Sequence, residues 1–338
     1  MKVSLTGEFR CVVKDSAGLI VTDTGYNENM ILNQGLDFFG GGHGATINAK
    51  CAIGTGSIEP VATQTKLESF LALTDAVTAQ TVSDYVYVNS GDGIYKFWER
   101  KMFSFSGLGA VVIKELGLVS TGTTAEDYYL TTRSLIKDSQ GNNSTLTLEA
   151  GYTLDIYYKI NKYILTADEI FQVNLLDAEG APIPYNVTVR PAAVGDSNSN
   201  SVSTPLKIFT STVAGIFYQS TELESITTKS TNSTRSGARL LGGSVSLGDY
   251  LDGSYKRTLF LNFGVDAGNL AGGLRTLNNR ASYNVNLSSG SVSKFDQVFD
   301  FYPFQLRFGS VAGDLPIPKN ANETLTVPLQ ISWGRLEV

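Results

Sequence analysis

The chain has 338 residues, of which 17% are charged, against ~25% in a typical soluble protein. Hydrophobic residues make up 42% of the chain, so packed cores can form and global disorder is excluded. The net charge is −6 and Lys and Arg are not clustered, which argues against nucleic acid as a partner because phosphate binding requires such clusters. The length favours two domains, and the many Phe, Tyr, Gly, Ser, Thr and Asn residues predict an all-β fold.

The start of the chain does not read as a targeting segment. Residues 1–8 lack the apolar core of a signal peptide, and no apolar run reaches the roughly 18 residues that a transmembrane helix needs. We therefore expect neither export nor membrane insertion.

The first predicted elements are a β-hairpin and a short helix. Residues 5–21 alternate apolar and polar side chains around a turn at 15–18, as in an antiparallel hairpin. A helix is expected near 29–39, capped by Asn27 or Asn29 and ended by the glycines at 40–42. Its apolar residues fall near one face at helical spacing: Met30, Ile31, Leu32, Leu36 and Phe39.

A buried strand and a tight turn follow. The run at 51–53 is apolar, glycines at 54 and 56 supply the turn, and Pro60 cannot extend the strand. A weak helix or irregular excursion is expected at 63–73. We call residues 26–70 the signature segment, because they contain the most specific local pattern of the chain.

The signature segment reads N-x-I-L-N-x-G-L-D at 29–37, G-T-G-x-x-x-P at 54–60 and T-x-L-E at 65–68. This order resembles the N-terminal region of tail-associated structural proteins of tailed bacteriophages. The resemblance implies a non-enzymatic virion protein, made in the host cytoplasm and present in several copies in the tail, collar, baseplate or fibre attachment. Its implied partners are further copies of itself and other virion proteins.

Short motifs from the first half recur in the same order in the second half. The turn at 15–18 is echoed at 177–180, and the sequence at 65–69 is echoed at 221–225. The D-G-x-Y-K motif at 92–96 recurs at 252–256, and the strand at 145–148 has a counterpart at 324–327. Four ordered matches predict an internal duplication, with an N-terminal β domain at 1–165 and a homologous C-terminal β domain at 166–338. The junction at 165–169 lacks Pro and Gly, so the two domains are expected to pack together.

Each domain is predicted to be a β-sandwich or small barrel. Short strands rich in aromatic residues are expected at 95–105, 259–263 and 301–308, and a longer strand pattern at 145–163 turns at 149–151. The Ser-, Asn- and Thr-rich stretches at 195–203 and 227–236 are predicted to be long loops.

No catalytic, cofactor-binding or metal-binding residue is predicted. The single histidine, His43, lies in a glycine-rich loop that cannot hold a base in place. One histidine and two separated cysteines do not form the usual closed zinc site, and Cys11 and Cys51 are expected to be buried, reduced thiols. The G-T-G turn lacks the third glycine of the dinucleotide-binding pattern, because Glu59 stands there.

Three binding or enzymatic alternatives remain open at this point. A pair of carboxylates could hydrolyse glycosides, and D-x-x-G turns offer oxygen ligands for calcium, although acids such as Asp15, Asp92, Asp177 and Asp252 fit structural turns. Aromatic residues could form a platform for a host-surface glycan, or pack in the core: Trp98, Tyr85, Tyr87, Tyr128 and Tyr129. The alternatives to a tail component are therefore a receptor- or glycan-binding tail module, a head decoration protein and a carbohydrate-degrading enzyme.

Strand edges indicate assembly. The patterns at 85–88 and 301–308 are apolar and carry few charges or prolines, which are the residues that protect an exposed edge from pairing. They predict a symmetric homo-oligomer.

Overall fold

The computed structural model describes residues 2–40, 48–77, 80, 82–89, 93–177, 179–191, 216–219, 222–223, 225–226, 240–242, 244–279, 284–285, 292–293 and 304–336. These residues lie mostly in β-strands, with a single α-helix among them, α1 (Asn33–Gly40). No helix in these ranges is long and apolar enough to cross a membrane. The predicted β class is therefore confirmed.

The strands form four sheets of 13, 6, 2 and 2 strands. The strands up to residue 165 are β1 (Lys2–Lys14), β2 (Ile20–Asp23), β3 (Asn27–Ile31), β4 (Lys50–Gly54), β5 (Phe70–Asp75), β6 (Val82–Asn89), β7 (Ile94–Phe105), β8 (Val111–Ile113), β9 (Glu115–Val119), β10 (Thr132–Leu135), β11 (Leu146–Leu148) and β12 (Thr153–Leu165). The later strands are β13 (Glu169–Leu176), β14 (Pro182–Pro191), β15 (Ile216–Gln219), β16 (Leu240–Gly242), β17 (Ser244–Leu247), β18 (Lys256–Phe263), β19 (Thr276–Asn279), β20 (Asn284–Val285), β21 (Val292–Ser293), β22 (Phe304–Ser310) and β23 (Leu325–Arg335).

Strand β1 is the centre of the 13-stranded sheet. Its residues alternate between buried and half-buried positions, as the sequence pattern predicts for a strand with one core face. One edge of β1 pairs antiparallel with β12 along almost its whole length. The other edge pairs in succession with β23 in parallel, and with β3 and β2 antiparallel. The predicted hairpin at 5–21 is confirmed by the β1–β2 pair.

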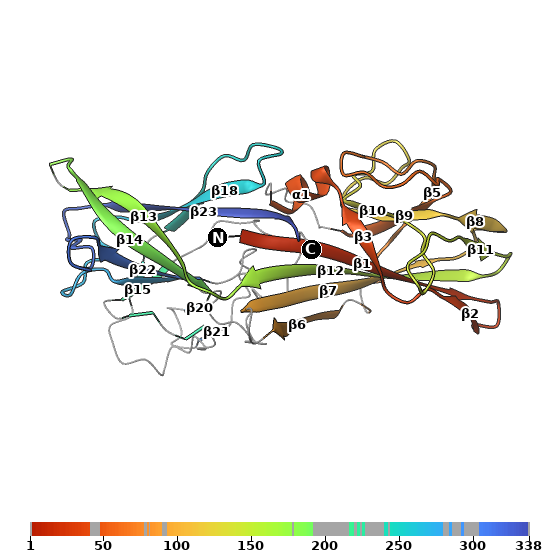
Figure 1. Cartoon of the computed structure of the whole chain (residues 1–338), viewed down its shortest axis with the longest axis horizontal. Coiled ribbons are helices and arrows are strands. Elements are labelled where there is room, and N and C mark those ends of the chain that lie inside the picture. The colour runs from red at the N-terminus through yellow and green to blue at the C-terminus, as the bar shows by residue number, and fades with distance from the viewer. Residues whose placement is uncertain are drawn as a thin grey trace.

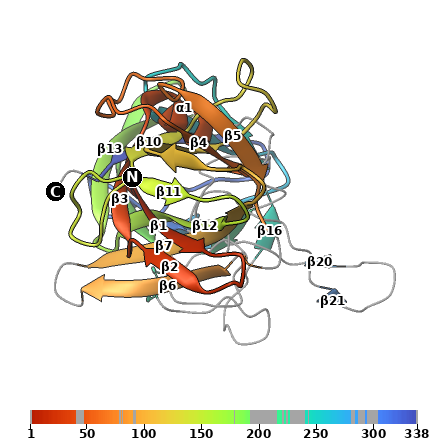
Figure 2. The same cartoon turned by 90° about the vertical axis from the view of Figure 1, so that its right-hand side faces the viewer.

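The 13-stranded sheet curls around β1 into two arms. One arm continues from β12 through β7 to β6, and the other runs from β3 through β10, β9 and β4 to β5. Figure 2 shows the first arm below the second, with β1 between them. Both arms direct side chains into one hydrophobic cluster, which includes Phe9, Cys51, Phe103, Leu118 and Ile156. An isolated bridge between Ala76 and Phe103 joins the two arms, and residues of α1 and of the β8–β11 sheet add to the same cluster.

The described residues of the second half contribute to the two large sheets and form the small β20–β21 sheet. Strands β17, β18 and β23 extend the 13-stranded sheet beyond β1, and β13, β14, β22, β19, β15 and β16 form the six-stranded sheet in that order. Buried residues of both sheets, such as Leu261 and Leu329 in one and Val187 and Leu306 in the other, belong to the same cluster as the first half. Figure 1 shows an elongated molecule with the β1–β2 hairpin at one end and the β13–β14 hairpin at the other.

Two local predictions are wrong and a third is confirmed only in part. Residues 27–31 form strand β3, so the helix begins at Asn33 and not near 29, because this segment pairs with β1 and β10 instead of forming helical hydrogen bonds. Of the weak helix or irregular excursion predicted at 63–73, residues 63–69 are irregular, which confirms the second alternative there, and residues 70–73 belong to strand β5 (Phe70–Asp75). The strand predicted at 301–308 is not an exposed edge: β22 pairs on both sides, with β14 and β19, and Phe304, Leu306 and Phe308 are fully buried.

Several other predictions are confirmed. The run at 51–53 is the buried strand β4, and the turn at 149–151 separates β11 from β12. Cys11 and Cys51 are both buried and free. His43 and the loops predicted at 195–203 and 227–236 lie outside the described residues.

Candidate functional site

The signature segment is built around a buried ion pair. Arg133 on β10 and Glu115 on β9 have fully buried side chains, and the Arg133 Nη2 atom lies 2.8 Å from Glu115 Oε2. Arg133 Nε donates to the same oxygen at 2.9 Å, and Nη1 donates to Gln64 Oε1 at 2.7 Å. A buried guanidinium needs a partner for its charge, and Glu115 supplies it. Nε and Nη1 also form hydrogen bonds, whereas Nη2 contacts Glu115 without one.

Backbone donors complete the environment of the Glu115 carboxylate. The N–H groups of Gly56, Glu68 and Ser69 donate to it at 3.1, 3.1 and 2.8 Å. A Cβ atom at Gly56 would lie 2.4 Å from Glu115 Oε1, so the close approach requires glycine. The G-T-G turn therefore does bind an anion, but the anion is a side chain of the same protein. This agrees with the sequence interpretation of a turn and not a phosphate site.

The remaining loop residues are fixed by a second carboxylate. Glu68 accepts hydrogen bonds from the N–H groups of Ser57 and Ile58 at 2.5 and 2.6 Å. Leu67 N–H donates to the Tyr128 hydroxyl at 2.7 Å, and burial raises the pKa of that hydroxyl. The loop between β4 and β5 is thus held by side chains from β9, β10 and the segment before β10, although it has no regular secondary structure.

The helical part of the signature segment contacts the second half of the chain. Asp37 Oδ1 accepts hydrogen bonds from the Tyr250 hydroxyl and from Gly253 N–H, the latter at 2.7 Å. Trp333 Nε1 donates to the Leu36 carbonyl at 2.8 Å, and the Trp333 ring stacks on Tyr250 with ring centroids 5.5 Å apart. Burial, with the Asp37 carboxylate beside it, raises the pKa of Tyr250. We call this set of contacts the clasp.

The clasp joins two motifs that sequence analysis singled out separately. Asp37 ends the N-x-I-L-N-x-G-L-D pattern, and Gly253 belongs to the recurring D-G-x-Y-K motif. Arg335, near the end of β23, adds hydrogen bonds to the Ile31 carbonyl at 2.6 Å and to Asn33 Oδ1 at 2.7 Å. Burial lowers the pKa of Arg335.

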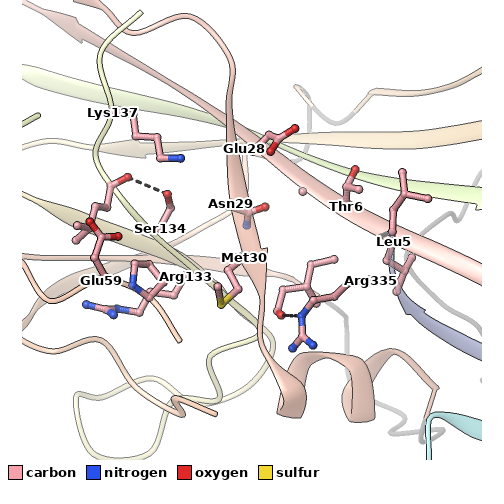
Figure 3. A pocket seen from close by; sticks show the side chains of 15 residues that line it. Leu5, Thr6, Glu28, Asn29, Met30, Glu59, Arg133, Ser134, Lys137 and Arg335 are labelled. Carbon is pink, nitrogen blue, oxygen red and sulfur yellow. Dashed lines mark hydrogen bonds between the residues drawn. The ribbon is translucent and has the colours of Figure 1, made fainter. Parts of the chain in front are cut away.

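A pocket of about 370 Å³ lies where β3 separates from β1 beside the end of β23 (Figure 3). Its lining includes backbone of β1 and β3 and the side chains of Glu28, Asn29, Lys137 and Arg335. Arg133 also borders it, but its guanidinium is engaged by Glu115, and the Arg335 guanidinium is engaged by β3 and α1. The guanidinium groups of both arginines that line the pocket are therefore occupied by contacts within the chain.

The cysteines and turn aspartates that the structure describes occupy core and turn positions. Burial raises the pKa of both cysteine thiols, so they stay protonated and buried in the core. No group of three or more His, Cys, Asp or Glu within the described ranges could hold a metal ion. The Asp15 and Asp177 carboxylates accept hydrogen bonds from N–H groups of their own turns, as expected for structural turn residues.

Tyr128 and Tyr129 pack within the protein instead of forming an exposed platform. Tyr128 is buried beside Phe70, with ring centroids 5.2 Å apart. Tyr129 packs on Phe38 with the same centroid distance, and its hydroxyl donates to the Gln34 carbonyl. Trp98 lies on β7, in the other arm of the curled sheet. The side chains of Tyr85 and Tyr87 lie outside the described set.

Sequence analysis missed the Arg133–Glu115 pair. The two residues are 18 positions apart and show no motif, because antiparallel pairing of β9 and β10 brings them together. The available signal is a single charge in each of two otherwise uncharged strand segments, at 115–119 and 132–135. Comparisons with protein-family models, curated proteins and solved structures found no match to the chain.

Proposed function

We propose that the protein is a non-enzymatic structural component of a tailed-bacteriophage virion, present in several copies in the tail. The proposal rests on the resemblance of the signature segment to tail-associated structural proteins. Its partners would be further copies of itself and other virion proteins. Its location would be the virion.

One observation carries the non-enzymatic part of the proposal. Three polar residues of the signature segment are occupied by contacts within the chain: Asn33 binds Arg335, Asp37 binds Tyr250 and Gly253, and Glu68 binds the loop backbone. Groups that form such contacts stabilise a scaffold, whereas catalytic groups must reach a substrate. A structural role therefore explains why the signature segment contains the most specific local pattern of the chain.

We propose further that the chain is a duplication of a β-sandwich or small-barrel domain, with the boundary at 165/166. The strand trio β6–β7–β12 has a counterpart in β17–β18–β23: both are antiparallel in the same order. The first connection of each trio contains a glycine with positive φ, Gly93 at 61° and Gly253 at 78°. An experimental structure covering all of 166–338 tests the duplication. The same strand order in both halves supports it, and a different order contradicts it.

Purified particles test the virion assignment. Quantitative mass spectrometry of mature virions should detect the protein at several copies per particle, at a constant ratio to the other tail proteins. Absence from purified particles contradicts the proposal. One copy per particle together with binding on a glycan array would support the receptor- or glycan-binding alternative instead.

A substrate screen tests the absence of catalysis. Polysaccharide, peptidoglycan and peptide substrates should show no turnover above that of heat-unfolded protein. Turnover that is lost on changing one Asp or Glu, with the unfolding midpoint unchanged, would overturn the structural interpretation.

A further inference from the structure

Strand β13 is an unprotected edge of the six-stranded sheet. Among the residues that the structure describes, it pairs with β14 on one side and is the terminal strand of the sheet on the other. Residues 170–176 contain no charge, proline or glycine, and the β13–β14 register is continuous, without a bulge. Its outer side chains are open, with Ile170 69% exposed and Leu176 71% exposed. Proteins normally protect an edge of this length with charges, prolines or bulges.

Other edge strands among the described residues are shorter than β13 or carry protecting features. Strand β2 has four residues, includes Asp23 and has a register shift where it pairs with β1. Strand β6 contains Asp84 near its middle and has a register shift near its end. Strand β5 ends with Asp75, which forms an ion pair with Lys50. Strands β16 and β17 are also terminal strands without a charge, but they have only three and four residues. Strand β13, with eight residues of which only Glu169 is charged, is therefore the longest such edge that the structure describes.

The hairpin geometry identifies which backbone groups face the free edge. Asp177 N–H donates to the Ala181 carbonyl, and hydrogen-bonded pairs alternate along an antiparallel ladder. In the β13–β14 register, the odd residues of β13 therefore bond to β14. Pro182 and Pro184, which cannot donate, lie opposite even residues and agree with this assignment. The N–H and carbonyl groups of residues 170, 172, 174 and 176 point outward.

The sequence of β13 is complementary to itself about Val173. If two copies pair antiparallel with Val173 on the two-fold axis, the outward-facing residues form hydrogen-bonded pairs. Ile170 then lies opposite Leu176 of the second copy, and Gln172 lies opposite Asn174, so apolar pairs with apolar and amide pairs with amide. If this register shifts by two residues in either direction, Ile170 or Leu176 of one copy lies opposite a polar residue or a turn residue of the other copy. One register is therefore favoured.

We propose that β13 pairs with β13 of a second copy of the chain, in this two-fold register, and joins the two six-stranded sheets into one. The hairpin lies at an end of the elongated molecule, where a second copy can approach (Figure 1). The inference rests on the multi-copy assembly proposed above and names the surface that mediates it. A contact of this kind is isologous, because the same residues act on both sides.

Disulfide trapping tests the register in the full-length protein. In a Val173→Cys variant the two introduced thiols face each other at a non-hydrogen-bonded pair, where the Cα atoms are about 4.5 Å apart and a disulfide can form. Phe171→Cys is the matched control. In the proposed register, residue 171 of one copy lies opposite residue 175 of the second copy, so the two introduced thiols are separated by about 13 Å along the strand. We expect oxidised dimer with Val173→Cys and little with Phe171→Cys. Equal yields, or no dimer from Val173→Cys in concentrated folded protein, overturn the proposal.

Charge variants separate self-pairing from pairing with another virion protein. Gln172→Lys with Asn174→Lys puts like charges opposite each other and should abolish dimers in sedimentation equilibrium. Gln172→Lys with Asn174→Glu puts opposite charges together and should restore or strengthen them, which only the self-paired register explains. The same loss in both double variants overturns the inference. These measurements use the purified protein and need no virions. A negative result would overturn the β13 pairing, and the mass spectrometry of virions would still test the proposed function.

Discussion

The two halves of the molecule use the same strand trio with different neighbours. In the first half, the trio β6–β7–β12 is continued by β1, which pairs antiparallel with β12. In the second half, the trio β17–β18–β23 is continued by the same β1, now in parallel with β23. One strand therefore borders both trios. Strand β1 of the first half therefore extends the β17–β18–β23 trio of the second half, and the two halves share one sheet.

The halves also differ in where their ionic groups lie. The Arg133–Glu115 pair is fully buried and holds an irregular loop in place. In the second half, Arg307 binds Glu222 and Asp314, whose side chains are 62% and 59% exposed. These two carboxylates raise the pKa of Arg307. Buried ion pairs are costly to break, whereas exposed ones contribute little, so the two clusters should respond very differently to substitution.

The largest effect is expected from Arg133→Met. The substitution leaves the Glu115 carboxylate buried without its cation, which should lower the free energy of unfolding by about 3–5 kcal/mol. Urea denaturation followed by tryptophan fluorescence measures the change. Adding Glu115→Gln removes the stranded charge and should recover part of the loss. A single variant that unfolds like the wild type contradicts the role given to the pair.

An intermediate effect is expected from Asp37→Ala, which removes the acceptor shared by Tyr250 and Gly253. The loss should be about 1–3 kcal/mol, since hydrogen bonds to a charged acceptor are broken at a partly buried site. Asp37→Asn keeps the Oδ1 acceptor and is the matched control, with a smaller loss. If both variants unfold at the wild-type denaturant midpoint, the clasp does not hold the two halves together.

A pH effect is expected from Tyr129. Burial first, and then the nearby Asp37 and Asp252 carboxylates, raise the pKa of Tyr129 to about 12, from an ordinary value of about 10. The folded state disfavours the tyrosinate, so this contribution to stability is fully present below pH about 10 and is lost as the pH rises to about 12. The free energy of unfolding should decline across this window, and less steeply in Tyr129→Phe. Identical slopes would exclude the assignment.

The smallest effect is expected from Arg307→Met in the second half. Its partners are more than half exposed, so the loss should not exceed about 1 kcal/mol, and it should shrink further in high salt. Comparison with Arg133→Met by the same denaturation assay gives the contrast directly. A loss as large as that of Arg133→Met would remove the distinction drawn between the two halves.

The sequence predicts the strands better than it predicts their partners. The alternation in β1 and the apolar run in β4 are local patterns, and both strands form as expected. The apolar run at 30–32 fits a helix and a strand equally well by spacing, and the pairing of β3 with β1 and β10 decides between them. The pattern at 301–308 likewise predicts a strand. The place of this strand, β22, between β14 and β19 depends on residues that are distant in the sequence.

The site shows the same limit. The glycines of the G-T-G turn and the carboxylate of Asp37 are marked in the sequence, but their partners come from β9 and from residues 250–253. A local sequence pattern does not predict contacts between residues that are this far apart in the sequence. The self-complementary pattern of β13 is readable from sequence alone, yet its meaning depends on knowing that β13 is an edge strand and which of its backbone groups are free.

We propose that this protein is a scaffold that assembles with copies of itself in a virion. A cryo-electron microscopy reconstruction of the purified particle, at a resolution that separates β-strands, tests it most directly. The account predicts several symmetry-related copies, joined at interfaces above roughly 1,000 Å² that include the free edge of β13. A single copy per particle with small contacts to its neighbours, or no density for the chain, would contradict it.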